Sequence, residues 1–189
     1  GISFLKFSGL LVSSNTIWST NQNIDSNGFL VTNNATLTIN NGVTVTNAGP
    51  VLFSNGASGR IIVAGTSTVL TGTAFKVISG TAVFDVNKDI VTPPTFSSIN
   101  VTTGSTLTHT SNTSAHTYSL ILYSTGNFTI DAGSTISANG TGFSAGNGPG
   151  LGSSSGNCYP GASGGAYGGS GGAGSSGGVN NTTYGSVTQ

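Results

Sequence analysis

The sequence predicts an all-β protein, and three observations lead to that class. Short runs rich in Val, Ile, Thr and Phe recur through residues 24–140, and Asn or Gly separates them. Within several runs an apolar residue alternates with Thr or Ser, as at Leu37 and Ile39, which is the two-residue period of a half-buried strand. No segment carries a sustained helical stripe, and the chain lacks Met and Glu, two good helix formers. We therefore expect short strands joined by turns.

The expected strands follow one another closely. In chain order they lie within residues 28–33, 35–40, 42–47, 59–65, 67–72, 74–80, 82–87, 98–104, 118–126, 127–133 and 134–140. Asn suits the turns between them, because it tolerates a left-handed backbone and its side chain bonds nearby backbone groups. The apolar residues are expected to point inward, whereas Thr and Ser point outward.

Two architectures fit this pattern. The strands of a sandwich or jelly-roll filament subunit are joined by hairpins and recur roughly every 8–12 residues. A parallel β-helix, which is a solenoid, turns two or three corners in each coil and uses shorter strands. The short runs favour the parallel β-helix, and the jelly roll is the alternative. Their spacing leaves the coil length open.

Three regions are expected along the chain. Residues 1–23 contain an N-terminal strand that either caps the first coil or is donated to a neighbour. Residues 24–140 form the coils, with an irregular stretch at 88–98, because its Pro pair does not fit an interior strand. Residues 141–189 form a glycine-rich loop segment, packed on the solenoid or on a neighbouring subunit.

The glycine-rich segment matches neither a collagen nor a phosphate-binding pattern. It lacks Gly at every third position, and it has no Lys after its glycines, which a P-loop requires. Flexible linkers share its composition, but Phe143, Tyr159 and Tyr167 supply rings that can lie on a neighbouring surface, so an ordered loop is favoured. Cys158 is the single cysteine, which excludes a disulfide within the chain, and a loop position is the favoured interpretation.

Two stretches resemble a known family of repeats. "NNATLTINNGVTVTNAG" (33–49) and "NFTIDAGSTISANGTGF" (127–143) resemble coils of the right-handed parallel β-helices of large secreted adhesins and surface proteins. The glycine-rich stretch 140–186 resembles an insertion that recurs beside such coils in very large extracellular proteins of bacteria and protists. The resemblance covers roughly residues 24–189 and implies a right-handed β-helix and an extracellular or cell-surface location. Its motifs are low in complexity, so they indicate architecture and location far better than activity.

The low charge content argues against some classes of function and favours another. Charged residues make up 4% of the chain, against roughly a quarter in typical domains. So few basic residues form no patch for nucleic acid, and no apolar run reaches the ~20 residues that span a membrane. Low charge also weakens repulsion between copies, which favours self-association into a homo-oligomer or filament.

The sequence does not predict an enzyme, and no cofactor is expected. A glycosidase needs two carboxylates beside the scissile bond. Without Glu, that pair would come from Asp85 and Asp89 or from distant coils, and the basic and calcium-binding cluster of a polysaccharide lyase is missing. Thr-x-Thr motifs at 36–38, 44–46, 66–68 and 71–73 suggest an ice-binding face, but their unequal spacing favours ordinary outward-facing residues.

One stretch has partial metal-site spacing. Asp85, Asn87 and Asp89 alternate as the first ligands of a calcium loop do. Ile90 stands where that loop needs Gly, and Phe96 where it needs Glu, so a solvated strand end is the favoured interpretation. His109 and His116 are too isolated to indicate a metal site.

Several asparagines are candidates for covalent glycans, because each lies in an Asn-x-Ser/Thr sequon. They are Asn34, Asn100, Asn112, Asn127, Asn139, Asn180 and Asn181. In a chain so rich in Asn, Ser and Thr, about this many sequons arise by chance. Attached sugar would supply the solubility that charge does not.

These observations predict an extracellular structural protein, a self-assembling subunit or segment of a surface fibre, filament or adhesin, and a candidate glycoprotein. An assembly strand would use the apolar anchors Ile2, Phe4, Phe7 and Leu11, and the equal alternative is that this strand covers the first coil of its own chain. The second candidate function is a carbohydrate-binding module that acts through exposed aromatics such as Trp18, Tyr159 and Tyr167.

Overall fold

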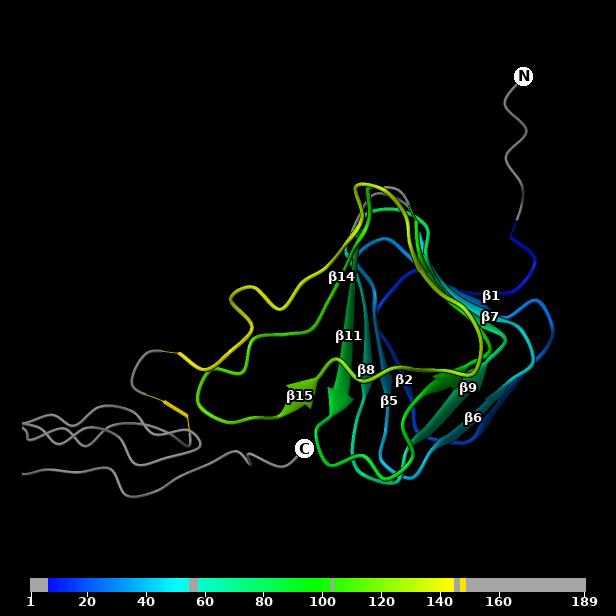
Figure 1. The fold of residues 1–189 in the computed structure, drawn as a ribbon. Helices are drawn as coiled ribbons and strands as arrows, with labels where there is room; N and C mark the ends of the chain where they lie inside the picture. Colours follow the sequence, from blue (N-terminus) through cyan, green and yellow to red (C-terminus); the bar gives the residue numbers. More distant parts are fainter. Residues whose placement is uncertain (1–6, 55–57, 103, 145–146, 149–189) are drawn as a thin grey trace, which may run out of the picture. The chain divides into compact units, whose positions relative to one another are not determined.

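The chain winds through three parallel β-sheets, so that successive coils stack on one another (Figure 1). This computed structural model describes residues 7–54, 58–102, 104–144 and 147–148. Contacts divide the chain into two units, residues 1–111 with 117–141, and residues 112–116 with 142–189. Every described strand lies in the first unit.

Each coil contributes short strands to the sheets, and their bounds are as follows. The first sheet contains β1 (Leu10–Val12), β4 (Phe29–Val31), β7 (Pro50–Phe53), β10 (Ala74–Val77), β13 (Ile99–Val101) and β17 (Phe128–Ile130). The second contains β2 (Thr16–Trp18), β5 (Thr36–Ile39), β8 (Gly59–Val63), β11 (Thr81–Asn87), β14 (Thr106–Thr108) and β18 (Thr135–Ile136). The third contains β3 (Gln22–Ile24), β6 (Thr44–Asn47), β9 (Val69–Gly72), β12 (Thr95–Phe96) and β16 (Tyr123–Ser124).

The predicted parallel β-helix is confirmed. Neighbouring coils pair in parallel in all three sheets, and the described residues contain no helix. Among the described strands, the one antiparallel pair joins β15 (Tyr118–Ser119) to the end of β11. A jelly roll would be built from antiparallel hairpins throughout, so that alternative does not describe this chain.

The coils begin before residue 24. Strands β1, β2 and β3 form a coil within residues 10–24, where the sequence predicted a cap or a donated strand. These strands have three residues each, and polar stretches separate them, so they show too little alternation for the period to be recognised. At the predicted irregular stretch, β12 directly follows the loop that carries the Pro pair.

Stacked apolar side chains fill the interior. The inward positions of consecutive strands align, as Phe29 with Val51 and Val51 with Phe75, and all three are fully buried. Phe75 lies where the three sheets meet, because its ring centroid is 5.0 Å from that of Phe84 and 5.3 Å from that of Phe96. One core therefore runs along the coils.

Asn side chains join consecutive coils at the corners. Between the first and second sheets, Oδ1 of Asn15 accepts the Thr36 amide at 2.9 Å, and Oδ1 of Asn34 accepts the Ser58 amide at 2.8 Å. The corner between the second and third sheets has the same arrangement at Asn21 and Asn41. Asn33 and Asn34 adopt the positive φ that turn asparagines tolerate, whereas Asn15, Asn21 and Asn41 do not.

The second unit is described only in part. The Ser144 amide donates to the Thr113 carbonyl, and the rings of His116 and Phe143 meet edge to face at 6.3 Å. Residues 149–189 lie outside the described residues, and with them most of the predicted glycine-rich segment 141–189, including Cys158.

Candidate functional site

A buried carboxylate lies on the outer side of the second sheet. Asp85 alternates along β11 with the inward-facing Phe84 and Val86, so its side chain points away from the core, yet it is fully buried. Thr110, which follows β14 (Thr106–Thr108), supplies two of its hydrogen bonds. The amide of Thr110 donates to Oδ1 of Asp85 at 2.6 Å, and the Thr110 hydroxyl donates to Oδ2 at 2.6 Å.

Arg60 completes this group, which we call the Asp85 cluster: Arg60, Asp85, Thr110 and Tyr118. Nε of Arg60 on β8 lies 2.7 Å from Oδ2 of Asp85, and Nη2 lies 2.6 Å from the same oxygen. The guanidinium also lies over the Tyr118 ring, 6.0 Å from its centroid. The carboxylate is thus bound by charged and neutral donors of its own chain, which suits a clamp between coils.

The calcium candidates take partners within the chain. Asp85 belongs to the cluster just described, and Oδ1 of Asn87 accepts the Asp89 amide at 2.9 Å. Both oxygens of Asp89 lie 2.6 Å from Nζ of Lys88 at the surface. Over the described parts of the chain, no group of three or more His, Cys, Asp and Glu side chains is placed to hold a metal. Asp85 and Asp89, the candidate glycosidase pair, likewise pair with two different cations.

The two histidines lie in different units. Nδ1 of His109 is 2.9 Å from the Thr110 carbonyl oxygen, and Nε2 is 3.0 Å from the hydroxyl of Thr141. His109 therefore links the end of β14 to the turn after β18. His116 belongs to the second unit, where its ring contacts Phe143.

The candidate glycosylation residues differ in accessibility. Asn127 and Asn139 are exposed. Asn34 is also exposed, although its side-chain oxygen holds the Ser58 amide. Asn100 is half-buried, and Asn112 is 7% exposed. Asn180 and Asn181 lie outside the described residues.

Trp18 is not an exposed aromatic, so that part of the carbohydrate-binding prediction is wrong. It is 7% exposed, because it pairs in register with the inward-facing Ile39 and its ring packs edge to face on Phe29 at 5.2 Å. Tyr159 and Tyr167 lie outside the described residues. Sequence reasoning missed Tyr123, which is exposed on β16 and stands in register with the outward-facing Thr95.

The candidate assembly strand is described from Phe7 onward. Residues 10–12 pair as β1 with β4 of the same chain, as the alternative that this strand covers its own first coil requires. Phe7 is half-buried, and Leu11 points outward and is exposed. Ile2 and Phe4 lie outside the described residues, so their role stays a prediction.

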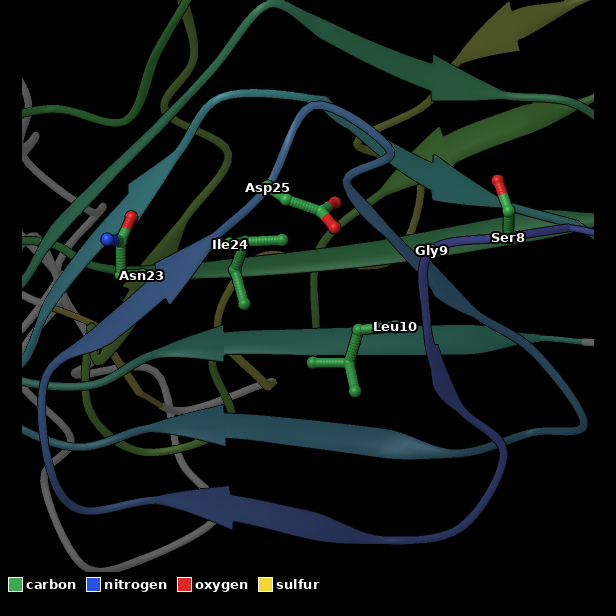
Figure 2. A pocket seen from close by; sticks show the side chains of 6 residues that line it. All are labelled: Ser8, Gly9, Leu10, Asn23, Ile24 and Asp25. Atoms are coloured by element: carbon green, nitrogen blue, oxygen red, sulfur yellow. The ribbon is translucent and has the colours of Figure 1, made fainter.

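The two ends of the solenoid are the sites where strands lack a neighbour on one side. Among the described strands, β1, β2 and β3 end the three sheets at one end, and β16, β17 and β18 end them at the other. We call these the first end and the last end. A pocket lies at the first end, lined by Ser8, Gly9, Leu10, Asn23, Ile24 and Asp25 (Figure 2).

The last end exposes apolar side chains that hold inward positions. Phe128 and Ile130 stand in register with the buried Ile99 and Val101, yet each is 47% exposed. Ile136 stands in register with the buried Leu107 and is 37% exposed. These positions continue the rows of inward-facing side chains that stack from coil to coil, which we call the inward rows. No described strand follows β17 and β18 in their sheets.

Comparisons with known proteins give no relative for this arrangement: no family model, no curated protein and no solved structure matches the chain. A search of the described residues for a helix long and apolar enough to cross a membrane finds none.

Proposed function

We propose that this chain is an extracellular structural protein, a self-assembling subunit or segment of a surface fibre, filament or adhesin. The observation that carries this proposal is the stacked interior, in which Phe29, Val51 and Phe75 continue one row through successive coils. Such a row, held by parallel ladders, makes each coil support the next, which suits a stiff rod. The Asn corner bonds support the same role.

The contacts of the buried carboxylate also support a structural role. The one fully buried carboxylate among the described residues, Asp85, binds Arg60 and Thr110 of the same chain. A catalytic acid or base must instead reach a substrate. This arrangement favours a non-enzymatic role. The exposed Asn127 and Asn139 support the proposal that the chain is a glycoprotein.

Immunogold electron microscopy tests the proposed function. Antibodies against the folded chain should label filaments or fibres on intact cells of the source organism without permeabilisation. Deglycosylation before electrophoresis should increase mobility if the sequons carry sugar. Label that appears only after permeabilisation, inside the cell, would refute an extracellular role.

A further inference from the structure

We propose that the last end of the solenoid binds the first end of a second copy, so that the three sheets continue from one chain into the next. This inference rests on the proposed function, because it names the partner and the surface for self-assembly. The occupant is a second copy of this chain, and the contact is head to tail.

The exposed side chains of the last end define the surface. Positions one coil earlier in the same rows, Ile99, Val101 and Leu107, are at most 1% exposed, because β17 and β18 cover them. Phe128 and Ile130 keep this inward orientation without a covering coil. Apolar area left in water is unfavourable. A further coil with inward apolar residues would remove that area from water.

The first end supplies a matching coil. Leu10 and Val12 begin the two inward rows of the first sheet, and Phe128 and Ile130 end the same two rows. Leu10 is 43% exposed and lines the pocket at this end, together with Ile24 (Figure 2). Placing the first end over the last end would set Leu10 above Phe128 and Val12 above Ile130.

Strand direction selects head-to-tail docking. The coils pair in parallel in all three sheets, so a second copy in the same orientation continues each ladder with the hydrogen-bond pattern already in use. Two last ends facing each other would need antiparallel pairing and a different register. Head-to-tail contacts use two different surfaces, so they propagate into filaments unless a rotation closes a ring. The charged content of 4% leaves little repulsion to oppose this contact.

The chain's own residues 149–189 are a poorer match for the last end. Every described strand of the first sheet presents two apolar residues, two positions apart, to the inward rows, so a strand that continues this sheet needs the same spacing. No two of the Leu, Val and Tyr residues in 149–189 stand two positions apart. A second copy supplies that spacing through Leu10 and Val12.

The test uses the full chain and light scattering coupled to size exclusion. The wild-type chain should form oligomers whose mass rises with concentration. Phe128→Asp and Ile130→Asp should each weaken association at least tenfold. Thr129→Asp is the matched control, because Thr129 lies between them on β17, is exposed, and pairs in register with the outward-facing Asn100. Circular dichroism should show the β-sheet content and the unfolding temperature of each variant unchanged.

Mixing two variants tests the head-to-tail geometry. Phe128→Asp blocks the last end, and Leu10→Asp blocks the first end, so each variant alone should be monomeric. An equimolar mixture should stop at dimers, because each copy keeps one intact end. If the mixture gives long oligomers, or if Phe128→Asp and Ile130→Asp associate like the wild type, the contact lies elsewhere and the inference fails.

The remaining outcomes separate this inference from the proposed function. A wild-type chain that stays monomeric to high concentration overturns the head-to-tail contact, even if immunogold labels the cell surface and the structural role stands. If deletion of residues 149–189 converts such a monomer into oligomers that Phe128→Asp dissolves, the chain covers its own last end. That result also overturns the inference for the intact chain.

Discussion

Single side chains secure this solenoid where the backbone ladders stop. At the corners, amides without a strand partner are held by Asn side chains one coil away, as at Asn15 and Asn34. Beyond the corners, Asp85 binds Arg60 and Thr110 on the outer side of the second sheet. Both devices link residues that are far apart in the sequence. Their effect on stability is therefore measurable by single substitutions.

Asp85→Asn should destabilise the fold by about 2 kcal/mol. Removing one partner of a buried ion pair costs about 3–5 kcal/mol, and this value is reduced here because water still reaches Arg60. Urea unfolding measures the loss. Asp89→Asn is the matched control, since Asp89 is exposed at the surface, and its effect should stay within about 0.5 kcal/mol. Equal effects of the two substitutions would show that the Asp85 cluster does not clamp the coils.

Gly28→Ala should destabilise the chain far more than Gly42→Ala. Both glycines have positive φ, so each substitution carries a backbone penalty of about 1–2 kcal/mol. A Cβ at Gly28 would also lie 2.0 Å from the carbonyl oxygen of Pro50, whereas a Cβ at Gly42 meets open space. The difference between the unfolding free energies of the two variants measures the cost of the steric clash at Gly28, because the backbone penalty is common to both. Similar losses would contradict the close approach of these two coils.

At the scale of the element, each strand works through its inward residues. In β10, Phe75 and Val77 are buried, and Lys76 between them is exposed. Phe75 contacts aromatic rings from the second and third sheets, so this one strand connects all three. The outward residue has no such contacts in the core.

Phe75→Ala should cost about 3–5 kcal/mol, because it removes a large buried side chain and leaves a cavity. The control on the same strand is Lys76→Ala, for which we expect a change within about 0.5 kcal/mol. Thermal and urea unfolding give both values. A loss below about 1 kcal/mol at Phe75 would mean that the three sheets do not depend on this ring.

At the scale of the whole molecule, apolar stacking and backbone ladders outweigh charge. The formal net charge is zero, and 4% of residues are charged, so long-range electrostatics contribute little to folding. In the part of the chain that the structure describes, the two ends differ from the middle, because inward-facing strand residues meet solvent there, as at Leu10 and Phe128. We therefore expect the stability of the single chain to depend little on salt.

The unfolding temperature should change by less than about 2 °C between 0.05 and 0.5 M sodium chloride. Salt screens exposed charges, of which this chain has few, and it acts weakly on the buried Asp85 pair. Calorimetry on Phe128→Asp, which we expect to be monomeric, removes the contribution of association. A decrease of many degrees would assign a larger share of the stability to ion pairs.

Much of the fold is readable from local patterns. Alternation at Leu37 and Ile39 identifies strands, and the Asn and Gly pairs identify corners, because side-chain direction in a strand and backbone freedom in a turn are local properties. The three-residue strands of the first coil carry too little alternation to be found this way. The candidate sites were harder to predict from the sequence. The prediction that Trp18 is exposed is wrong, and composition did not identify the exposed ends.

The sequence by itself determined that the chain is all-β, that its strands are short, and that it carries little charge, since these follow from residue type and spacing; it favoured stacked coils over a jelly roll without excluding the latter. Only the tertiary structure decided which coil covers which residue. It paired Asp85 with Arg60, placed Trp18 in the core, and left Phe128 exposed in an inward position. The reason is physical: burial depends on the neighbouring coil, which lies many residues away in the sequence, so residue type alone does not decide it.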